Sequence, residues 1–141
     1  MILFIKTLEA TELTFICIAI SKEVSELNHE EYYEQCAFIE WCRWKGYPYN
    51  LIFHIENEGK RSPKEGFLAK RAGKKAGIPD LYLPHASGGY HGLFIEMKAQ
   101  KGRLTDVQKE RIEELKAQGY AVGVCYGACQ AIACIEKYVK G

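Results

Sequence analysis

Residues 77–98, GIPDLYLPHASGGYHGLFIEMK, read as two apolar strands joined by a turn-rich loop. Strands are expected near Asp80–Leu83 and Gly92–Lys98, and their short connection predicts an antiparallel pair. Three charged residues fall within these strands: Asp80, Glu96 and Lys98. A charge in an otherwise apolar strand is costly unless it is paired or binds something. The stretch therefore predicts either a structural ion pair or a functional site.

Helices and strands alternate around this hairpin. The hydrophobic periodicity predicts a helix at residues 29–45, strands at 50–56, 80–83 and 92–98, a helix at 105–118, a strand at 121–126 and a helix at 129–139. Residues 57–77 are polar and rich in glycine, and they are expected to form a loop without a core element. The order is helix, three-strand meander, helix, strand, helix, which is a mixed α/β fold. The crossover through residues 105–118 should set strand 121–126 parallel to the strand that carries Glu96.

Composition and charge narrow the class of protein. The 141 residues have a mass of 16.0 kDa, 48% apolar residues and a formal net charge of +1, as in a soluble one-domain protein without a uniformly basic surface. The six cysteines include no CxxC pair, and free thiols are expected. The apolar segment 1–28 is too short in its longest apolar run to span a membrane. It is assigned as a separate segment that could form a dimer contact, ahead of a domain at 29–141.

The three strand charges suit a particular chemistry. Glu96 and Lys98 project to the same face of their strand, and Asp80 begins the neighbouring strand. Two carboxylates held close together repel each other unless a cation lies between them, and oxygen-only ligands suit Mg²⁺ or Mn²⁺. With a lysine beside the ion, this arrangement is typical of a metal-dependent phosphodiesterase. A buried ion pair involving Lys98 remains the alternative.

A run of cations precedes these strands. The basic residues of the stretch 60–75 face only Glu65 as a counter-charge within it, and they are Lys60, Arg61, Lys64, Lys70, Arg71, Lys74 and Lys75. Lys101 and Arg103 follow the Lys98 strand and extend the same basic edge. Attraction of nucleic-acid phosphates is the simplest use of such a cluster, and a solvated loop is the alternative.

Gln108 is a polar residue on an apolar helical stripe. It falls four residues after Leu104 and four before Ile112, on a stripe that also includes Val107 and Leu115. An inward amide could hold a phosphate or position water. Thr105 and Gln108 also form the pattern of a capping box, and the two roles are compatible. His54 alternates with apolar neighbours in its strand and is given no special role.

The segments GIPD (77–80), FIEMK (94–98), GRLTDVQ (102–108) and LKAQGYAVGV (115–124) together resemble the VRR-NUC (virus-type replication-repair nuclease) family of the PD-(D/E)XK superfamily. The resemblance covers the chain from about His29 onward. It implies a restriction-endonuclease-like fold. It also implies that Asp80 and Glu96 bind Mg²⁺ or Mn²⁺ together with the backbone carbonyl of Met97, that Lys98 is the catalytic lysine and that Gln108 is the glutamine that follows it.

The family also has a glutamate and a glutamine in its first helix. The segment HEEYYEQ (29–35) offers Glu31 with Gln35 on one helical face, so Glu31 is chosen as a further metal-binding and catalytic residue, with Glu34 as the rival. The family's Asn-Gly pair is interrupted here, where the sequence reads Asn57-Glu58-Gly59, so no role is assigned to Asn57.

The predicted function is that of a Mg²⁺- or Mn²⁺-dependent DNA endonuclease. The resemblance implies action on branched DNA such as four-way junctions, by a homodimer, in the cytoplasm of a bacterial or phage-infected cell, with no membrane partner. Two alternatives remain open: a non-catalytic DNA-binding module on the nuclease fold, and a restriction-type endonuclease that reads a base sequence.

Overall fold

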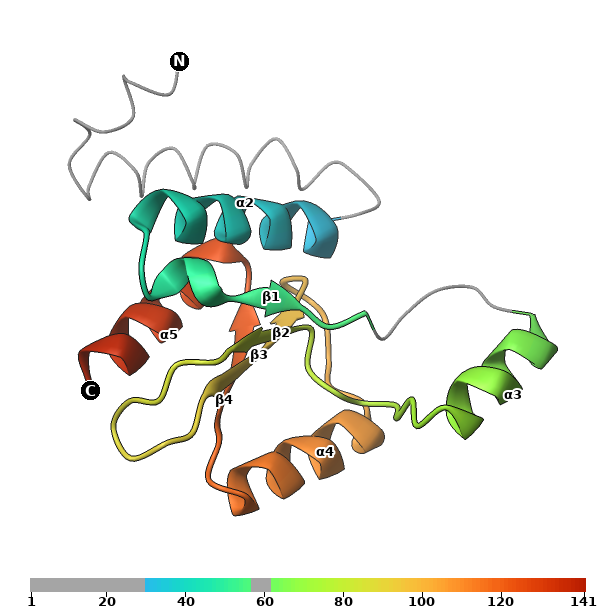
Figure 1. Ribbon diagram of the computed structural model, residues 1–141. Helices are drawn as coiled ribbons and strands as arrows, with labels where there is room; N and C mark the ends of the chain where they lie inside the picture. The colour runs from blue at the N-terminus through green and yellow to red at the C-terminus, as the bar shows by residue number, and fades with distance from the viewer. Residues whose placement is uncertain (1–29, 57–61) are drawn as a thin grey trace.

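The computed structural model describes residues 30–56 and 62–141, and Figure 1 shows the arrangement of their helices and strands. The elements, in chain order, are α2 (Glu30–Lys45), the 3₁₀ helix η2 (Tyr49–Leu51), β1 (Phe53–His54), α3 (Pro63–Arg71), β2 (Leu81–Leu83), β3 (Leu93–Lys98), α4 (Asp106–Ala117), β4 (Ala121–Tyr126) and α5 (Ala128–Lys140). The segment 1–28, with its predicted dimer contact, and the cations Lys60 and Arg61 lie outside the described residues.

The four strands form one mixed sheet in the order β1-β2-β3-β4. β2 and β3 pair antiparallel, with Leu81 opposite Ile95, and β4 runs parallel to β3. Both predictions of strand direction are therefore confirmed. Continuing the β2–β3 register by one residue sets Asp80 opposite Glu96, so the hairpin brings its two acidic residues to the same row of the sheet.

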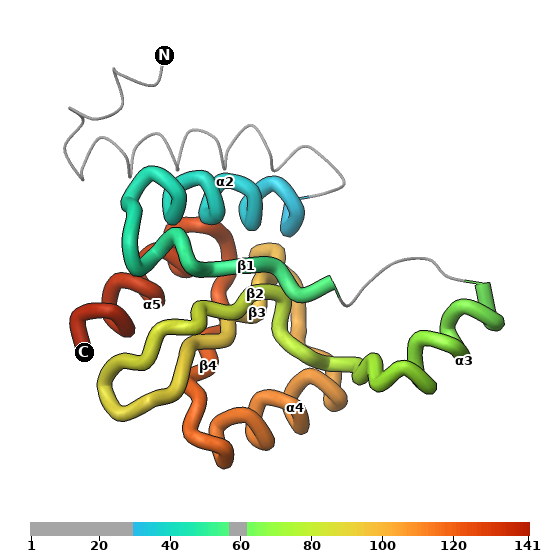
Figure 2. Tube along the Cα trace, viewed as in Figure 1, coloured from blue at the N-terminus to red at the C-terminus, as the bar shows by residue number. Residues whose placement is uncertain are grey.

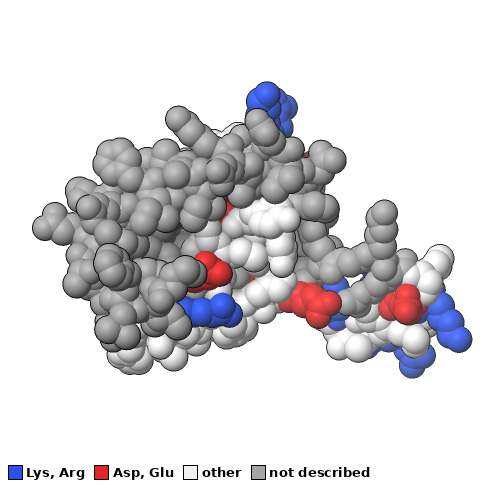
Figure 3. All heavy atoms as spheres, turned by 90° about the horizontal axis from the view of Figure 1, so that it is seen from above, with Lys and Arg blue, Asp and Glu red and all other residues white. Residues whose placement is uncertain are grey.

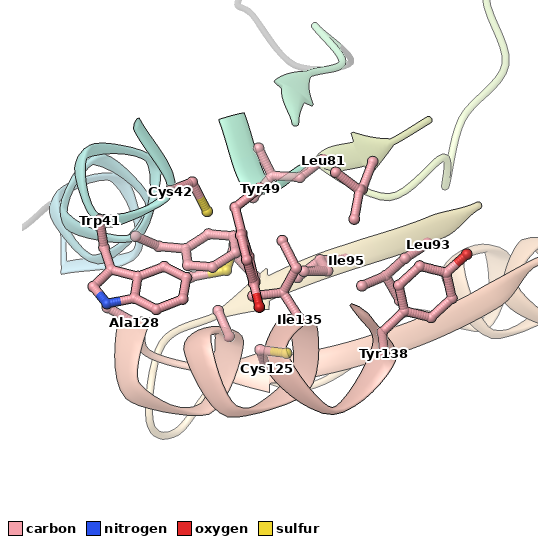
Figure 4. Packing of buried hydrophobic residues seen from close by; sticks show 14 residues of the cluster. Trp41, Cys42, Tyr49, Leu81, Leu93, Ile95, Cys125, Ala128, Ile135 and Tyr138 are labelled. Atoms are coloured by element: carbon pink, nitrogen blue, oxygen red, sulfur yellow. The ribbon is translucent and has the colours of Figure 1, made fainter. Parts of the chain in front are cut away.

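The main core lies on one face of the sheet, under α2 and α5. In α2 the buried residues Glu34, Phe38, Trp41 and Cys42 follow helical spacing, and this stripe packs toward α5 and the sheet. Figure 4 shows the side chains of α2, β2, β3 and α5 pointing into this common interior, with Ile95 and Ile135 at its centre. The inward side of β3 is therefore occupied by Leu93, Ile95 and Met97, which leaves Glu96 and Lys98 on the opposite face.

The opposite face carries α4 and a row of aromatic rings. The row crosses the sheet and consists, in spatial order, of Phe53, Tyr82, Phe94 and Tyr120. The ring centroids of neighbours in this row lie 4.5 to 5.6 Å apart. Only Ile112 of α4 is buried. Val107, assigned to the apolar stripe from the sequence, is 47% exposed, so that assignment is wrong.

Two other expectations need correction. The expected strand at 50–56 is reduced to the two residues of β1, because the chain enters it through the 3₁₀ helix. The expected loop at 57–77 contains α3, which begins with a capping box between Ser62 and Glu65 and has Pro63 in its first turn. No residue of α3 is buried, so the expectation that this segment adds nothing to the core is confirmed.

The five cysteines in the described part of the chain are free thiols, as expected. No helix in that part is both long enough and apolar enough to cross a membrane.

Candidate active site

Asp80 is positioned by a tight approach of the chain to α4. Gly77 has φ +77°, and a Cβ on it would lie 2.7 Å from the carbonyl oxygen of Val107, so the turn requires glycine. Pro79 is fully buried, and Asp80 follows it at the entrance to β2. The Oδ2 atom of Asp80 accepts a hydrogen bond from the backbone N–H of Met97 at 2.8 Å. The carboxylate is thereby tied to β3 between Glu96 and Lys98.

Glu96 is the most buried acid of the site. Its residue exposure is 2%, and its Oε1 atom accepts hydrogen bonds from Lys98 Nζ at 2.9 Å and from Gln108 Nε2 at 2.6 Å. Burial, and then the nearby charge of Asp80, raise the pKa of Glu96 to about 7, while Lys98 acts in the opposite direction. The ion pair with Lys98 therefore does not offset the cost of the buried carboxylate.

Lys98 is held among acids. Burial alone would lower the pKa of Lys98, but the hydrogen bond to Glu96 and the charges of Glu96, Glu31 and Asp80 raise it above its ordinary value. The side chain is thus an ammonium group at neutral pH. Lys98 therefore lies near three carboxylates and forms the predicted ion pair with Glu96.

Gln108 forms the predicted capping box and also contacts Glu96. Its Oε1 atom accepts from the backbone N–H of Thr105 at 2.9 Å, and its own N–H donates to the Thr105 hydroxyl at 3.2 Å, which completes the capping box of α4. Its Nε2 atom at the same time donates to Glu96. The start of α4 is therefore joined directly to the acidic site by one side chain.

Glu31 and Glu34 have different surroundings. Glu31 acts electrostatically on both Glu96 and Lys98. Glu34 is buried, and its Oε2 atom accepts from the backbone N–H of Ala128 at 2.7 Å. Because Gly127 has no side-chain oxygen to cap α5, Glu34 does so from α2. The geometry therefore favours Glu31 as the acid that faces the site.

His54 is a neighbour of the site that the sequence did not indicate. Its Nδ1 atom lies 3.0 Å from the carbonyl oxygen of Asp80 and 3.2 Å from Nε2 of Gln35. A carbonyl oxygen can only accept, so the contact with Asp80 requires Nδ1–H as the donor. The backbone N–H of Ile55 donates to the same carbonyl at 2.7 Å. β1 therefore fixes the backbone of Asp80 from the side opposite to β3. This contact could have been predicted only from the pairing of β1 with β2.

The site residues suit a hard divalent cation. In the described part of the chain, no group of three or more His, Cys, Asp or Glu residues is arranged to surround a metal ion. Magnesium, however, keeps several waters and usually takes only one or two carboxylates from a protein. Asp80 and Glu96 are close enough for one charge to raise the pKa of the other, and the donor atoms are all oxygen. This chemistry fits Mg²⁺ or Mn²⁺.

The predicted DNA-binding cations fall into two groups. Lys64, Lys70 and Arg71 belong to α3, and Lys74 and Lys75 follow it. α3 projects from the rest of the molecule, and Lys and Arg atoms gather on the projecting part (Figures 2 and 3). Lys101 and Arg103 lie between β3 and α4, directly after Lys98. Both groups are thus connected to the strands of the site by short segments.

Comparison with known proteins identifies relatives. A family model described as the VRR-NUC domain matches residues 20–129. A solved structure described as a VRR_NUC domain protein has 36% sequence identity to this chain and a TM-score of 0.66, over 78% of this chain and 88% of the other. No curated protein matches. The structural likeness confirms the restriction-endonuclease-like fold expected from the sequence.

Proposed function

This chain belongs to the VRR-NUC family, a nuclease-type family, and we propose that it is a Mg²⁺- or Mn²⁺-dependent endonuclease that hydrolyses the phosphodiester bonds of branched DNA. The observation that carries the proposal is the cluster of two acids and a lysine that the β2–β3 hairpin brings together at the end of β3. There, Glu96 is buried beside Asp80, and Lys98 is the cation that pairs with it. A divalent cation bound between the two carboxylates would stabilise the charged form of Glu96.

The residues divide the work of hydrolysis between them. Asp80 and Glu96, with the carbonyl of Met97 and with Glu31 nearby, would hold the cation, which when bound supplies a Lewis acid for water and for the phosphodiester. Lys98 is protonated, so it acts through its positive charge: it stabilises hydroxide relative to water and the charge that builds on the phosphoryl oxygens. Gln108 fixes the orientation of the Glu96 carboxylate.

The reaction balances as a simple hydrolysis. The oxygen of water forms a bond to phosphorus, the bond from phosphorus to the 3′-oxygen breaks, and that oxygen takes up a proton. The products are a 3′-hydroxyl and a 5′-phosphate.

The preference for branched DNA and a homodimeric state are parts of the same proposal. The basic α3, which projects from the molecule, supports contact with DNA beyond the cleaved strand. Resolution of a four-way junction needs two cuts, which a dimer with two sites can make. The mass of the particle in solution tests the dimer directly.

The test is cleavage of labelled duplex, flap, splayed-arm and four-way-junction DNA, each with Mg²⁺, with Mn²⁺ and with EDTA. Wild type should cut only with metal, and Lys98→Ala should lose cutting. Lys109→Ala is the matched control, because this lysine of α4 has 60% of its side chain exposed. Binding without cutting under every metal would reject the enzyme and support a DNA-binding module. Cutting at one base sequence irrespective of DNA shape would support a restriction-type enzyme.

A further inference from the structure

The outer face of α3 combines apolar and basic side chains. Phe67 is 60% exposed and Leu68 is 51% exposed. They lie three and four residues after Lys64, and Arg71 lies four after Phe67, so all four side chains share one helical face. The guanidinium carbon of Arg71 is 6.0 Å from the centre of the Phe67 ring. Two apolar side chains are thus bracketed by two cations on a surface that contributes nothing to the core.

Local interactions, rather than packing, stabilise this helix. The backbone N–H and the hydroxyl of Ser62 donate to Oε2 of Glu65 at 2.8 and 2.9 Å, and the N–H of Glu65 donates to the Ser62 hydroxyl at 3.3 Å. At the other end, Gly73 has φ +96°, and its N–H donates to the carbonyl of Lys70. A helix that is capped at both ends yet buries no residue presents Phe67 and Leu68 in a fixed geometry. Exposed apolar groups held in this way mark a contact surface.

The charge of this surface favours DNA as its partner over a second copy of the chain. Glu65, the one acid of α3, is engaged in the helix cap, whereas Lys64, Lys70 and Arg71 carry positive charge along the helix. Two such surfaces would repel each other, whereas the phosphates of DNA are complementary to them.

The path of the chain places this surface within reach of the site. Nine residue steps separate Arg71 from Asp80, so their Cα atoms cannot be more than about 32 Å apart. That span is about one turn of duplex DNA. Gly77 is anchored against α4 along this path, which restricts how far α3 can move away.

We propose that Phe67 and Leu68 form a wedge that stacks against unpaired or unstacked bases at the branch point of the DNA substrate, while Lys64 and Arg71 bind the flanking phosphates. The inference rests on the proposed function, because it assigns this wedge to the same DNA that the Asp80–Glu96 site would cut. Base pairs within a continuous duplex offer no free face, whereas a branch point exposes one. Apolar side chains flanked by cations are the chemistry that unstacks or supports such bases.

The experiment uses four-way-junction and duplex DNA that carry 2-aminopurine, next to the branch point or at the matching duplex position, with EDTA or Ca²⁺ in place of Mg²⁺. The proteins are wild type, the double variant F67A/L68A, and Tyr90→Ala as the matched control. Tyr90 is 48% exposed and lies in the β2–β3 connection, at the end of these strands opposite to Asp80 and Lys98. Thermal unfolding verifies that each variant is folded.

Wild type and Tyr90→Ala should raise the 2-aminopurine fluorescence of the junction and leave that of the duplex unchanged. F67A/L68A should lose this rise and bind the junction about 5- to 150-fold more weakly, the range expected for losing one stacked base. Its affinity for duplex DNA, which depends on the cations, should be unchanged.

Three results would overturn the inference. They are a fluorescence rise in F67A/L68A equal to that of wild type, an equal loss of affinity for both DNAs, and conversion of a dimer to a monomer by the double substitution. The last result would make α3 a subunit contact. Parallel cleavage assays with Mg²⁺ distinguish a failure of the wedge from a failure of the proposed nuclease function. If one of these three results is found while wild type still cuts DNA, the nuclease stands without a wedge. Unstacking by a wild type that does not cut would retain the wedge on a protein that is not a nuclease.

Discussion

Replacing Glu96 by glutamine should stabilise the metal-free protein while it removes activity. Glutamine keeps the shape of the side chain and an oxygen that can accept from Gln108, but it removes the buried charge. The folded-state pKa of Glu96 is about 7, against an ordinary value of 4.5. Between these values the folded protein holds a proton that the unfolded chain has released. The free energy of unfolding of wild type therefore falls as pH rises from 4.5 to 7 and is level above that.

The size of this effect follows from the difference between the two pKa values. It corresponds to about 3 kcal/mol in the free energy of unfolding. Glu96→Gln should be more stable than wild type by only about 1 kcal/mol near pH 5 and by up to about 3 kcal/mol at pH 8. A divalent cation at 1,000 times its dissociation constant should reverse the order, since it adds about 4.1 kcal/mol to wild type. The variant, which lacks one of the two carboxylates, should gain little.

Urea unfolding at pH 5 and pH 8, with EDTA or with Mn²⁺, measures all of these quantities. Tryptophan fluorescence serves as the probe, because Trp41 is 9% exposed and lies in the main core, whereas Trp44 is already 37% exposed in the folded protein. Glu113→Gln is the matched control, since that side chain is 72% exposed. A Glu96→Gln variant that is less stable than wild type at pH 8 without metal would refute the reasoning, as would equal stabilisation of both proteins by Mn²⁺.

Four other substitutions separate structural from functional roles. Glu34→Ala should lower the free energy of unfolding by about 2–3 kcal/mol, because it leaves the buried N–H of Ala128 without its charged acceptor. The Mn²⁺ affinity of the folded protein should be unchanged, and a lost metal site would contradict this assignment. Glu31→Gln should weaken Mn²⁺ binding, as measured by calorimetric titration. Unchanged binding would remove Glu31 from the site. Thr105→Ala and Gln108→Ala should each lower the free energy of unfolding by about 1 kcal/mol, because each removes the helix cap. Only Gln108→Ala should also reduce the cleavage rate, and equal rates in both variants would show that the Gln108–Glu96 hydrogen bond has no role in cleavage.

The hairpin could be predicted from the sequence because side chains alternate between the two faces of a strand, which leaves few possible arrangements. The apolar residues Leu93, Ile95 and Met97 must share one face, which forces Glu96 and Lys98 to the other face. The short connection then dictates an antiparallel partner and brings Asp80 alongside. Local spacing alone therefore determines the triad and its shared face.

α3 was missed although its start was readable. The Ser62-x-x-Glu65 pattern with Pro63 in the first turn indicates a helix, but the segment buries no apolar stripe and so has no periodicity of the usual kind. Val107 shows the converse case: its spacing fits the apolar stripe, yet α4 covers only part of the sheet and leaves this residue exposed. The bond between His54 and Asp80 depends on the β1–β2 register, which a two-residue strand does not encode.

The most direct test of the central claim is single-turnover cleavage of a labelled four-way junction with Mg²⁺ by wild type and by Asp80→Asn. Asparagine keeps an oxygen that can accept the N–H of Met97, so the fold is retained while one metal-binding charge is lost. The account predicts metal-dependent cutting by wild type that leaves a 5′-phosphate, and none by the variant. Cutting by Asp80→Asn at the wild-type rate would contradict it.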